Sequence, residues 1–360
     1  MNLANLTFQS IRFLLLPFAL LYWLVIGIRN KLYDKNILKS ARFNLPIICV
    51  GNLSVGGTGK SPMVEYLLRL LQNEYAVATL SRGYKRKTKG YVLANSNTTS
   101  LEIGDEPKLF QIKFPSVAVA VGEERLVAIP QLLQDKPETG VIILDDAFQH
   151  RAVKAGLNIL LTDYNNLYTR DFYLPTGDLR DLKTSSRRAN IIVVTKCPPH
   201  LTADEKSAIL QELAIGAGQQ VFFSAIEYGL PYHLIHNNEI SLNKEMEVLL
   251  VTGIANPQPL KKMVGDITLS YETMAFSDHH IFSIDDFNEI KKRFGKIEAE
   301  HKIILTTEKD AIRLVKFKDE LADIPLYVVP IRHKILFEES PAFNSLIVNF
   351  IRNFKKAPKE

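Results

Sequence analysis

Residues 51–62 read GNLSVGGTGKSP, and this stretch decides the fold. It follows an apolar run, LPIICV at 45–50, and precedes MVEYLLRLL at 63–71, whose apolar residues recur at helical spacing. A strand, a glycine-rich turn and a helix in this order are the setting of a phosphate-binding loop. The sequence therefore predicts an α/β protein with such a loop at the end of a buried strand.

The residue types in this loop have physical reasons. Gly56, Gly57 and Gly59 lack a Cβ, so several backbone N–H groups can converge on one anion. We expect Lys60 to reach the β- and γ-phosphates of a nucleotide and the Ser61 hydroxyl to bind Mg²⁺. The alternative is an ordinary tight turn that happens to end in Gly-Lys-Ser.

Length and composition are those of a folded protein of two domains. The chain has 360 residues, of which 46% are apolar and 23% charged, and a domain typically takes about 150 residues. The net charge of +5 suits an anionic ligand or a membrane surface, but no basic stripe with interleaved aromatics indicates nucleic acid. Cys49 and Cys197 lie at apolar runs and are expected to be buried thiols of a cytosolic protein.

The N-terminal region carries sixteen residues without a charge, Phe13 to Ile28. A spanning helix usually needs about 20 apolar residues, so we expect an anchor that lies on or partly in the membrane, with Tyr22 and Trp23 at its interface. The alternative is a long core helix packed on the domain, and both can hold at once. Basic residues that suit anionic headgroups follow the apolar run: Arg29, Lys31, Lys35, Lys39 and Arg42.

Short apolar runs alternate with helical segments from residue 45 to about 224. Such runs are typical of strands buried on both faces, and their alternation with helices indicates a doubly wound, mainly parallel sheet. Ligands of these sheets bind at the carboxyl ends of the strands. The expected strands are 46–50, 75–81, 116–121, 141–146, 157–163, 191–196 and 221–225.

A second, smaller α/β lobe is expected from residue 226. It shows a possible hairpin at Asn237–Asn238, a strand at 302–307, a strand within 325–331 and a helix at 285–294. A cleft between lobes is the usual place for a substrate. The expected units are an N-terminal membrane-associating region (1–42), a nucleotide-binding domain (43–225), the smaller lobe (226–335) and a C-terminal helical region (336–360), whose amphipathic helix runs from 342 to 354.

Two acidic motifs suit metal and proton chemistry. Asp145 and Asp146 end a buried strand, where a nucleotide-bound Mg²⁺ is held, although paired aspartates alone would indicate a turn or a cap. In GDEP, residues 104–107, Asp105 and Glu106 open a helical pattern and are candidates for a base or a metal-organising group, or for a helix cap.

Further candidates lie in loops. SDHH at 277–280 offers an Asp-His pair that can act as an oriented base, although a loop histidine is more often merely exposed. TTEKD at 306–310 opens a helix and either contacts a nucleotide or caps that helix. The basic groups expected to face an anionic substrate are Arg82, Arg125 and Arg180, each of which could also be a solvated surface residue.

Together these motifs resemble the tetraacyldisaccharide 4′-kinase family, the lipid A 4′-kinases of Gram-negative bacteria. The matching strings run in the family's order over residues 51–310, and an apolar N-terminal helix precedes them. They are GNLSVGGTGKSP, SRGYKR, GDEP, VGEER, LDDAFQH, LPTGDLRD, VTK, FSDHH and TTEKD.

The resemblance implies transfer of the ATP γ-phosphate to the 4′-hydroxyl of a tetraacylated glucosamine disaccharide 1-phosphate, at the cytoplasmic face of the inner membrane. It implies that Asp105 and His279 form the dyad that activates this hydroxyl. It assigns phosphate binding to Ser54, Val55, Gly56, Gly57, Thr58, Gly59, Lys60 and Ser61. It assigns Mg²⁺ to Ser61, Asp145 and Glu106, and the γ-phosphate and substrate side to Arg125, Asp146, Gln149, His150 and Arg180. We expect a monomer.

Three positions depart from the usual pattern: Ser54 and Ala147 stand where glycine is common, and Lys85 follows SRGY. The main alternative function is a membrane-associated switch ATPase, but that class has a lysine where this chain has Val55. A GTPase would need an Asn/Thr-Lys-x-Asp motif, and Cys197 and Pro198 follow Thr195-Lys196 instead. A membrane adaptor would leave the phosphate and acidic motifs without a purpose.

Overall fold

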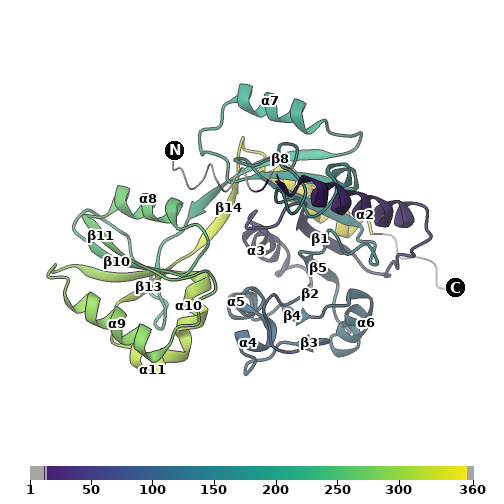
Figure 1. Ribbon diagram of the computed structural model, residues 1–360. Coiled ribbons are helices and arrows are strands. Elements are labelled where there is room, and N and C mark those ends of the chain that lie inside the picture. Colours follow the sequence, from purple (N-terminus) through teal and green to yellow (C-terminus); the bar gives the residue numbers. More distant parts are fainter. Residues whose placement is uncertain (1–11, 13, 355–360) are drawn as a thin grey trace.

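The computed structural model describes residue 12 and residues 14–354, which form two lobes (Figure 1). The larger lobe is built on a nine-stranded sheet. In hydrogen-bonded order its strands are β14 (Ile331–Ile335), β8 (Gln220–Tyr228), β7 (Ile191–Thr195), β6 (Leu157–Asp163), β1 (Ile47–Asn52), β5 (Val141–Asp145), β2 (Val77–Ser81), β4 (Ala118–Val121) and β3 (Val92–Leu93).

This sheet confirms the predicted doubly wound, mainly parallel architecture. Every strand from β8 to β4 runs parallel to its neighbours, and the two edge strands, β14 and β3, run antiparallel. Apolar side chains fill both faces. One face packs against α3 (Lys60–Leu71), α5 (Asp105–Lys113) and α12 (Ser340–Arg352), and the other against α6 (Arg125–Asp135) and α7 (Ala203–Leu213).

The smaller lobe has a five-stranded sheet with helices on both faces. Its strands, in order, are β11 (Ser270–Ala275), β10 (Glu247–Thr252), β12 (Lys302–Thr307), β13 (Leu326–Val329) and β9 (Tyr232–His233). Its helices are α8 (Gln258–Ile267), α9 (Ile284–Gly295), α10 (Glu308–Leu314) and α11 (Lys318–Leu321). The remaining short helices of the chain are α4 (Ser100–Ile103), η1 (Lys183–Arg188) and η2 (Val315–Phe317).

Two adjacent strands connect the lobes. The chain leaves the larger lobe through β8 and returns through β14. These two strands pair antiparallel, with Tyr228 opposite Ile331 and Ser224 opposite Ile335. Figure 1 shows β14 running from the smaller lobe into the larger one. The expected lobe 226–335 was therefore too long at its C-terminal end. Pro330, which has no N–H for a ladder, separates β13 from β14, so the expected strand within 325–331 ends before it.

Most other elements lie within a few residues of their expected bounds. The strand expected at 75–81 begins at Val77, the helix expected at 285–294 is α9, and the C-terminal helix begins at Ser340 and ends at Arg352. A tight turn at Asn237 follows β9, as the hairpin prediction required. Cys49 and Cys197 are buried free thiols.

The N-terminal helix α2 (Leu16–Asp34) lies on the surface of the larger lobe (Figure 1). Only Ala19 and Asn30 of this helix are buried, so it is not a core helix, although it packs on the domain as the alternative also expected. Apolar side chains of the segment that remain exposed are Leu14, Leu16, Phe18, Leu20, Leu21, Trp23, Leu24, Val25 and Ile28. Among the described residues, no helix has the length and apolar character needed to cross a bilayer. Phe13, with which the predicted anchor begins, lies outside the described residues.

Candidate active site

The phosphate loop has the predicted strand-loop-helix form. It follows β1, and Gly59, with φ +84°, is the N-cap of α3, which begins at Lys60. Gly56 has φ +97°, and glycine adopts such left-handed backbone without the penalty that a Cβ brings. Thr195 Oγ1 donates a hydrogen bond of 2.9 Å to the carbonyl of Thr58, so β7 holds the loop from below.

Asp146 forms ion pairs with two basic residues beside the phosphate loop. It follows β5 directly, with φ +52°. Lys60 Nζ lies 3.6 Å from Asp146 Oδ1, and the Arg180 guanidinium donates to both carboxylate oxygens. Burial alone would raise the pKa of Asp146, but the charges of Lys60 and Arg180 outweigh it and lower the pKa. The structure thus joins three residues that come from three separate sequence motifs.

The pKa of Asp145, one residue earlier, is shifted in the opposite direction. Its side chain is buried, and Oδ1 has no hydrogen-bond partner in the part of the chain that the structure describes. Burial, with the negative charges of Glu106 and Asp146, raises the pKa of Asp145 to about 7. A buried carboxylate that repels its neighbours and has an unpaired oxygen is the kind of group that a cation stabilises.

Glu106 connects the acidic edge to the loop. Ser61 Oγ donates to Glu106 Oε1 at 3.1 Å, and Lys309 Nζ of α10 donates to the same oxygen at 2.7 Å. Burial would raise the pKa of Glu106, but the charge of Lys309 and the Ser61 hydrogen bond lower it. Lys309 therefore supplies from the smaller lobe a positive charge to the carboxylate that we predicted as a metal organiser.

These residues fit Mg²⁺. Within the described ranges no group of three or more His, Cys, Asp or Glu side chains forms a ready metal cage. Mg²⁺ in kinases usually takes one or two carboxylates and completes its six ligands with phosphate and water. Asp145, with its unpaired buried oxygen, and the Ser61 hydroxyl suit that arrangement.

The predicted Asp-His pair forms across the two lobes. His279 Nδ1 lies 3.2 Å from Asp105 Oδ2, although 174 residues separate them in sequence. His279 has φ +63°, and its N–H donates to the carbonyl of Gly253 at 3.2 Å, which holds the SDHH loop at the end of β10. Asp105 opens α5 without acting as its cap: Gly104 is the N-cap, so the capping alternative for this motif is wrong.

The side of the site toward α2 carries basic and uncharged polar side chains. Gln149 Nε2 donates to the carbonyl of Asn52 at 2.7 Å, and Arg125 is buried. Burial, reinforced first by the charge of Arg125, lowers the pKa of His150 to about 4, and its Nε2 is buried without a partner among the described residues. His150 is therefore neutral near pH 7. Arg82 is exposed.

The N-terminal helix contacts the backbone of this same edge. Tyr22 Oη donates to the carbonyl of Arg180 at 3.0 Å, and an Arg29 nitrogen donates to the carbonyl of Gln149 at 3.0 Å. Of the basic residues expected to meet headgroups, Arg29 is thus partly engaged with the protein. The other four are exposed: Lys31, Lys35, Lys39 and Arg42.

Sequence reasoning missed four residues that hold the site. Asn52 Nδ2 donates to Thr58 Oγ1 at 2.9 Å, and His333 of β14 lies 2.9 Å from the carbonyl of Gly59. Lys309 and Arg313 reach Glu106 and Asp105 from α10. A signal for the last two existed, because residues four apart share one face of a helix. Thr307 caps α10, as the alternative reading of TTEKD required.

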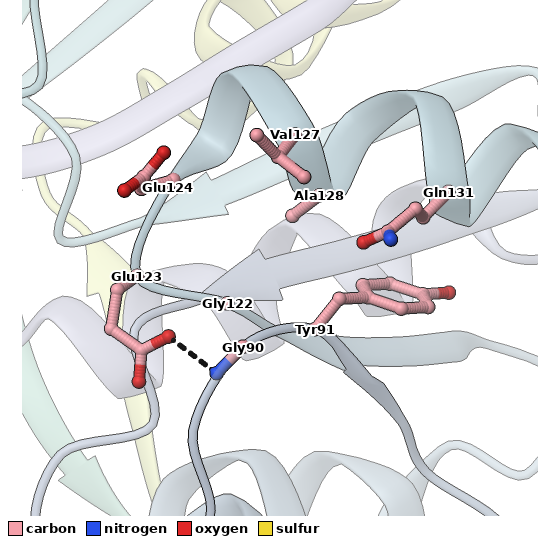
Figure 2. Close-up of a pocket in the computed structure, with 8 residues that line it drawn as sticks. All are labelled: Gly90, Tyr91, Gly122, Glu123, Glu124, Val127, Ala128 and Gln131. Atoms are coloured by element: carbon pink, nitrogen blue, oxygen red, sulfur yellow. Dashed lines mark hydrogen bonds between the residues drawn. The ribbon is translucent and has the colours of Figure 1, made fainter.

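A separate cavity of about 230 Å³ lies at the carboxyl end of β4 (Figure 2). Figure 2 shows Val127, Ala128 and Gln131 of α6 on one side, and the Glu123 carboxylate bonded to the N–H of Gly90 at 2.9 Å. None of the predicted site residues lines this cavity. The predicted residues gather instead around the phosphate loop and the first turn of α5.

Comparison with known proteins identifies the family. A family model described as tetraacyldisaccharide-1-P 4′-kinase matches residues 11–352. The chain belongs to this family. It is 45% identical over 353 residues to the tetraacyldisaccharide 4′-kinase of Bacteroides thetaiotaomicron, covering 94% of this chain and 93% of the relative. It is 45% identical over 346 residues to that of Flavobacterium johnsoniae, covering 95% and 98%.

A crystal structure supports the same assignment. LpxK from Aquifex aeolicus in complex with ATP is 32% identical, with a TM-score of 0.73 over 95% of this chain and 99% of that one. The tetraacyldisaccharide 4′-kinase family membership confirms the predicted α/β fold class, the ATP-dependent lipid A 4′-kinase function and ATP as its phosphoryl donor. The switch ATPase, GTPase and adaptor alternatives are therefore set aside.

Proposed function

We propose that the phosphate loop, the first turn of α5 and the SDHH loop together transfer the ATP γ-phosphoryl group to the 4′-hydroxyl of a tetraacylated glucosamine disaccharide 1-phosphate, with Asp105 as the base. One observation carries this assignment of roles. Asp105 and Glu106 are adjacent on α5, and one contacts His279 while the other contacts Ser61 of the phosphate loop. The proton acceptor is therefore the direct neighbour, on α5, of the residue that contacts the phosphate-binding loop.

The loop and its neighbours bind the nucleotide. The backbone N–H groups from Ser54 to Ser61 and the N-terminus of α3 surround the phosphates, and Lys60 adds a positive charge. Ser61 and Asp145, with Glu106 beside them, would hold Mg²⁺, which would neutralise the negative charge of the phosphate groups. Arg125 and Arg180 balance the charge on the equatorial oxygens in the transition state.

The acceptor is activated by Asp105. Asp105 takes the proton of the 4′-hydroxyl, the oxygen forms a bond to the γ-phosphorus, and the bond to the β-phosphate oxygen breaks to release ADP. Gln149 and His150 shape the substrate side as hydrogen-bonding groups, since His150 is neutral at pH 7. All of these residues belong to one chain, so we infer that a monomer is competent.

The surface of α2 supports binding of the acceptor lipid at a membrane. Its exposed apolar side chains and the exposed Lys31, Lys35, Lys39 and Arg42 suit a helix that lies in the interface of an anionic membrane. The same helix contacts the backbone of Arg180 and Gln149. We infer that the protein works at the cytoplasmic face of the inner membrane, with the acyl chains of its acceptor still in the bilayer.

Replacement of Asp105 tests this assignment. We expect Asp105→Asn to lower kcat for transfer to the lipid by about 10³-fold, as loss of a general base does, with little change in KM for ATP. Asp135→Asn is the control, because Asp135 lies at the end of α6, accepts a hydrogen bond from Tyr91 and belongs to neither the phosphate loop nor α5. Near-normal transfer by Asp105→Asn would overturn the role of Asp105.

A further inference from the structure

We propose that Arg313 is a positioning residue for phosphoryl transfer: its guanidinium holds Asp105 Oδ2 and His279 Nδ1 in one arrangement and leaves Asp105 Oδ1 for the acceptor hydroxyl. This inference rests on the proposed function, in which Asp105 is the base. It concerns α10, whose motif the sequence could assign only to nucleotide contact or to capping.

The contacts of Asp105 are unequally shared between its two oxygens. Arg313 Nε donates to Oδ2 at 2.9 Å and Arg313 Nη2 donates to it at 2.7 Å. His279 Nδ1 lies 3.2 Å from the same oxygen. The Arg313 and His279 contacts therefore all fall on Oδ2 and not on Oδ1. An oxygen without these contacts is available to receive a proton from a bound alcohol.

Arg313 also contacts His279 directly, and this contact favours one tautomer of the imidazole. Arg313 Nη2 lies 3.1 Å from His279 Nδ1. A guanidinium nitrogen can only donate, so Nδ1 accepts in this contact, and a neutral imidazole then carries its hydrogen on Nε2. With this tautomer Arg313, and not His279, is the donor to Oδ2. The pair Asp105–His279 is in fact a triad with the guanidinium at its centre.

The guanidinium is itself fixed from behind. The Arg313 side chain is only 5% exposed, and Nη1 donates to Asp310 Oδ1 at 3.0 Å. Asp310 Oδ2 accepts the N–H of Gly253 at 3.0 Å, and the carbonyl of Gly253 accepts the N–H of His279. One network therefore ties Arg313 and the His279 backbone to the end of β10.

Gly253 lies at the centre of this network, where a side chain would be crowded. A Cβ there would lie 3.0 Å from Asp310 Oδ1 and 3.1 Å from the carbonyl oxygen of Ser277, contacts tighter than most Cβ atoms make. Because Arg313 belongs to the smaller lobe and Asp105 to the larger one, the triad forms only while the two lobes lie together.

A double-mutant cycle tests the proposal. We expect Arg313→Gln to lower kcat for lipid phosphorylation by about 100-fold, the size of effect that misplacing a reacting group produces, with KM for ATP changed less than twofold. In an Asp105→Asn background the same replacement should cost less than threefold, because a residue that acts through another loses its effect when that one is absent. Single-turnover reactions with excess enzyme make the slow variants measurable.

Two controls and two outcomes make the test decisive. Arg332→Gln, at an exposed position of β14, should leave kcat unchanged. If Arg313→Gln does not fold, Arg313→Lys is carried through the same cycle, since an ammonium keeps the charge but not the forked geometry. Equal losses in both backgrounds, or no loss in the wild-type background, would overturn the inference while leaving the proposed function intact. Absence of lipid phosphorylation by the unaltered protein would instead overturn the proposed function.

Discussion

Asp145 and Asp146 show how two adjacent aspartates acquire opposite properties. Asp146 turns toward Lys60 and Arg180, which lower its pKa, whereas Asp145 ends a buried strand beside Glu106 and Asp146, and burial raises its pKa to about 7. The sequence predicted both as acidic groups at a strand end. It could not predict their difference, because the cations near Asp146 come from distant parts of the chain.

This difference predicts a pH dependence of metal binding. A carboxyl must lose its proton to bind Mg²⁺, so the affinity for Mg²⁺–ATP should rise from pH 6 to pH 8. The contribution of Asp145 to the stability of the protein without ligand changes with pH in the opposite direction. The raised pKa means that the stabilising contribution of the protonated Asp145 is complete below the unfolded pKa and is lost as pH rises through about 7. Mg²⁺–ATP should then stabilise the protein more at pH 8 than at pH 6.

Thermal unfolding with and without Mg²⁺–ATP measures this effect at both pH values. Asp145→Asn is the matched control, because it cannot ionise and should show weak stabilisation at both. His150, with a pKa of about 4, stays neutral throughout this range. An equal shift in Tm at pH 6 and pH 8 for the unaltered protein would contradict the role given to Asp145.

At the scale of elements, helix α10 joins the two lobes through charged side chains. Glu308, Lys309 and Arg313 of this helix all contact α5. Figure 1 shows α5 and α10 side by side between the lobes. The sequence predicted both helices, but their pairing depends on contacts about 200 residues apart, which no local pattern reveals.

Lys113 of α5 is the test of this interface. Its ammonium lies between the buried carboxylates of Glu65 and Glu308, and it donates to both. Burial, with the charge of Glu65, raises the pKa of Glu308. Lys113→Ala would leave two acidic groups facing each other without a cation, so we expect the free energy of unfolding to fall by about 3 kcal/mol.

Denaturant unfolding gives this free energy. Lys136→Ala serves as the control, because its pair with Glu138 is an exposed one at 3.9 Å, and such pairs contribute about 0–1 kcal/mol. If the two replacements change the free energy of unfolding by similar small amounts, the Glu65–Lys113–Glu308 group does not stabilise the interface.

Helix α2 carries the membrane prediction. Phe18, Leu21 and Val25 are exposed and recur at helical spacing. We expect the triple replacement of these residues by serine to weaken sedimentation with anionic lipid vesicles by at least about tenfold, since burial of each side chain contributes about 1.5–3 kcal/mol. Far-UV circular dichroism should be unchanged, because none of the three is buried.

The control for this experiment removes apolar surface elsewhere. Leu230, Leu269 and Ile284 are also exposed but lie in the smaller lobe, and their replacement by serine should leave vesicle binding unchanged. Equal effects of the two triple variants would mean that α2 is not a specific membrane contact.

At the scale of the whole molecule, a pair of strands connects the phosphate loop to the smaller lobe. β8 and β14 connect the lobes, and His333 of β14 lies within hydrogen-bond distance of Ser224 on β8 and of Gly59 in the phosphate loop. The nine-stranded sheet is thus completed by a strand that returns from the other lobe. Neither Pro330 nor the apolar run before it revealed this return, because antiparallel pairing at an edge has no local sequence signal.

What the sequence could predict follows from the range of the interactions. The phosphate loop depends on neighbouring residues, so its strand, turn and helix lie where the motif placed them. The Asp105–His279 pair was implied only by resemblance to the tetraacyldisaccharide 4′-kinase family, and Arg313 between them was not predicted. Contacts between residues of different lobes can be identified only when the arrangement of both lobes is known.

The most direct test of the central claim is the fate of the γ-phosphate. Purified protein in detergent is incubated with γ-labelled ATP, Mg²⁺ and the tetraacylated disaccharide 1-phosphate, and the product is analysed by ³¹P NMR. We predict one new phosphate monoester, at the 4′-oxygen, and a rate about 10²- to 10³-fold lower with Lys60→Ala. Label recovered only as inorganic phosphate, or on a different oxygen of the lipid, would contradict the account.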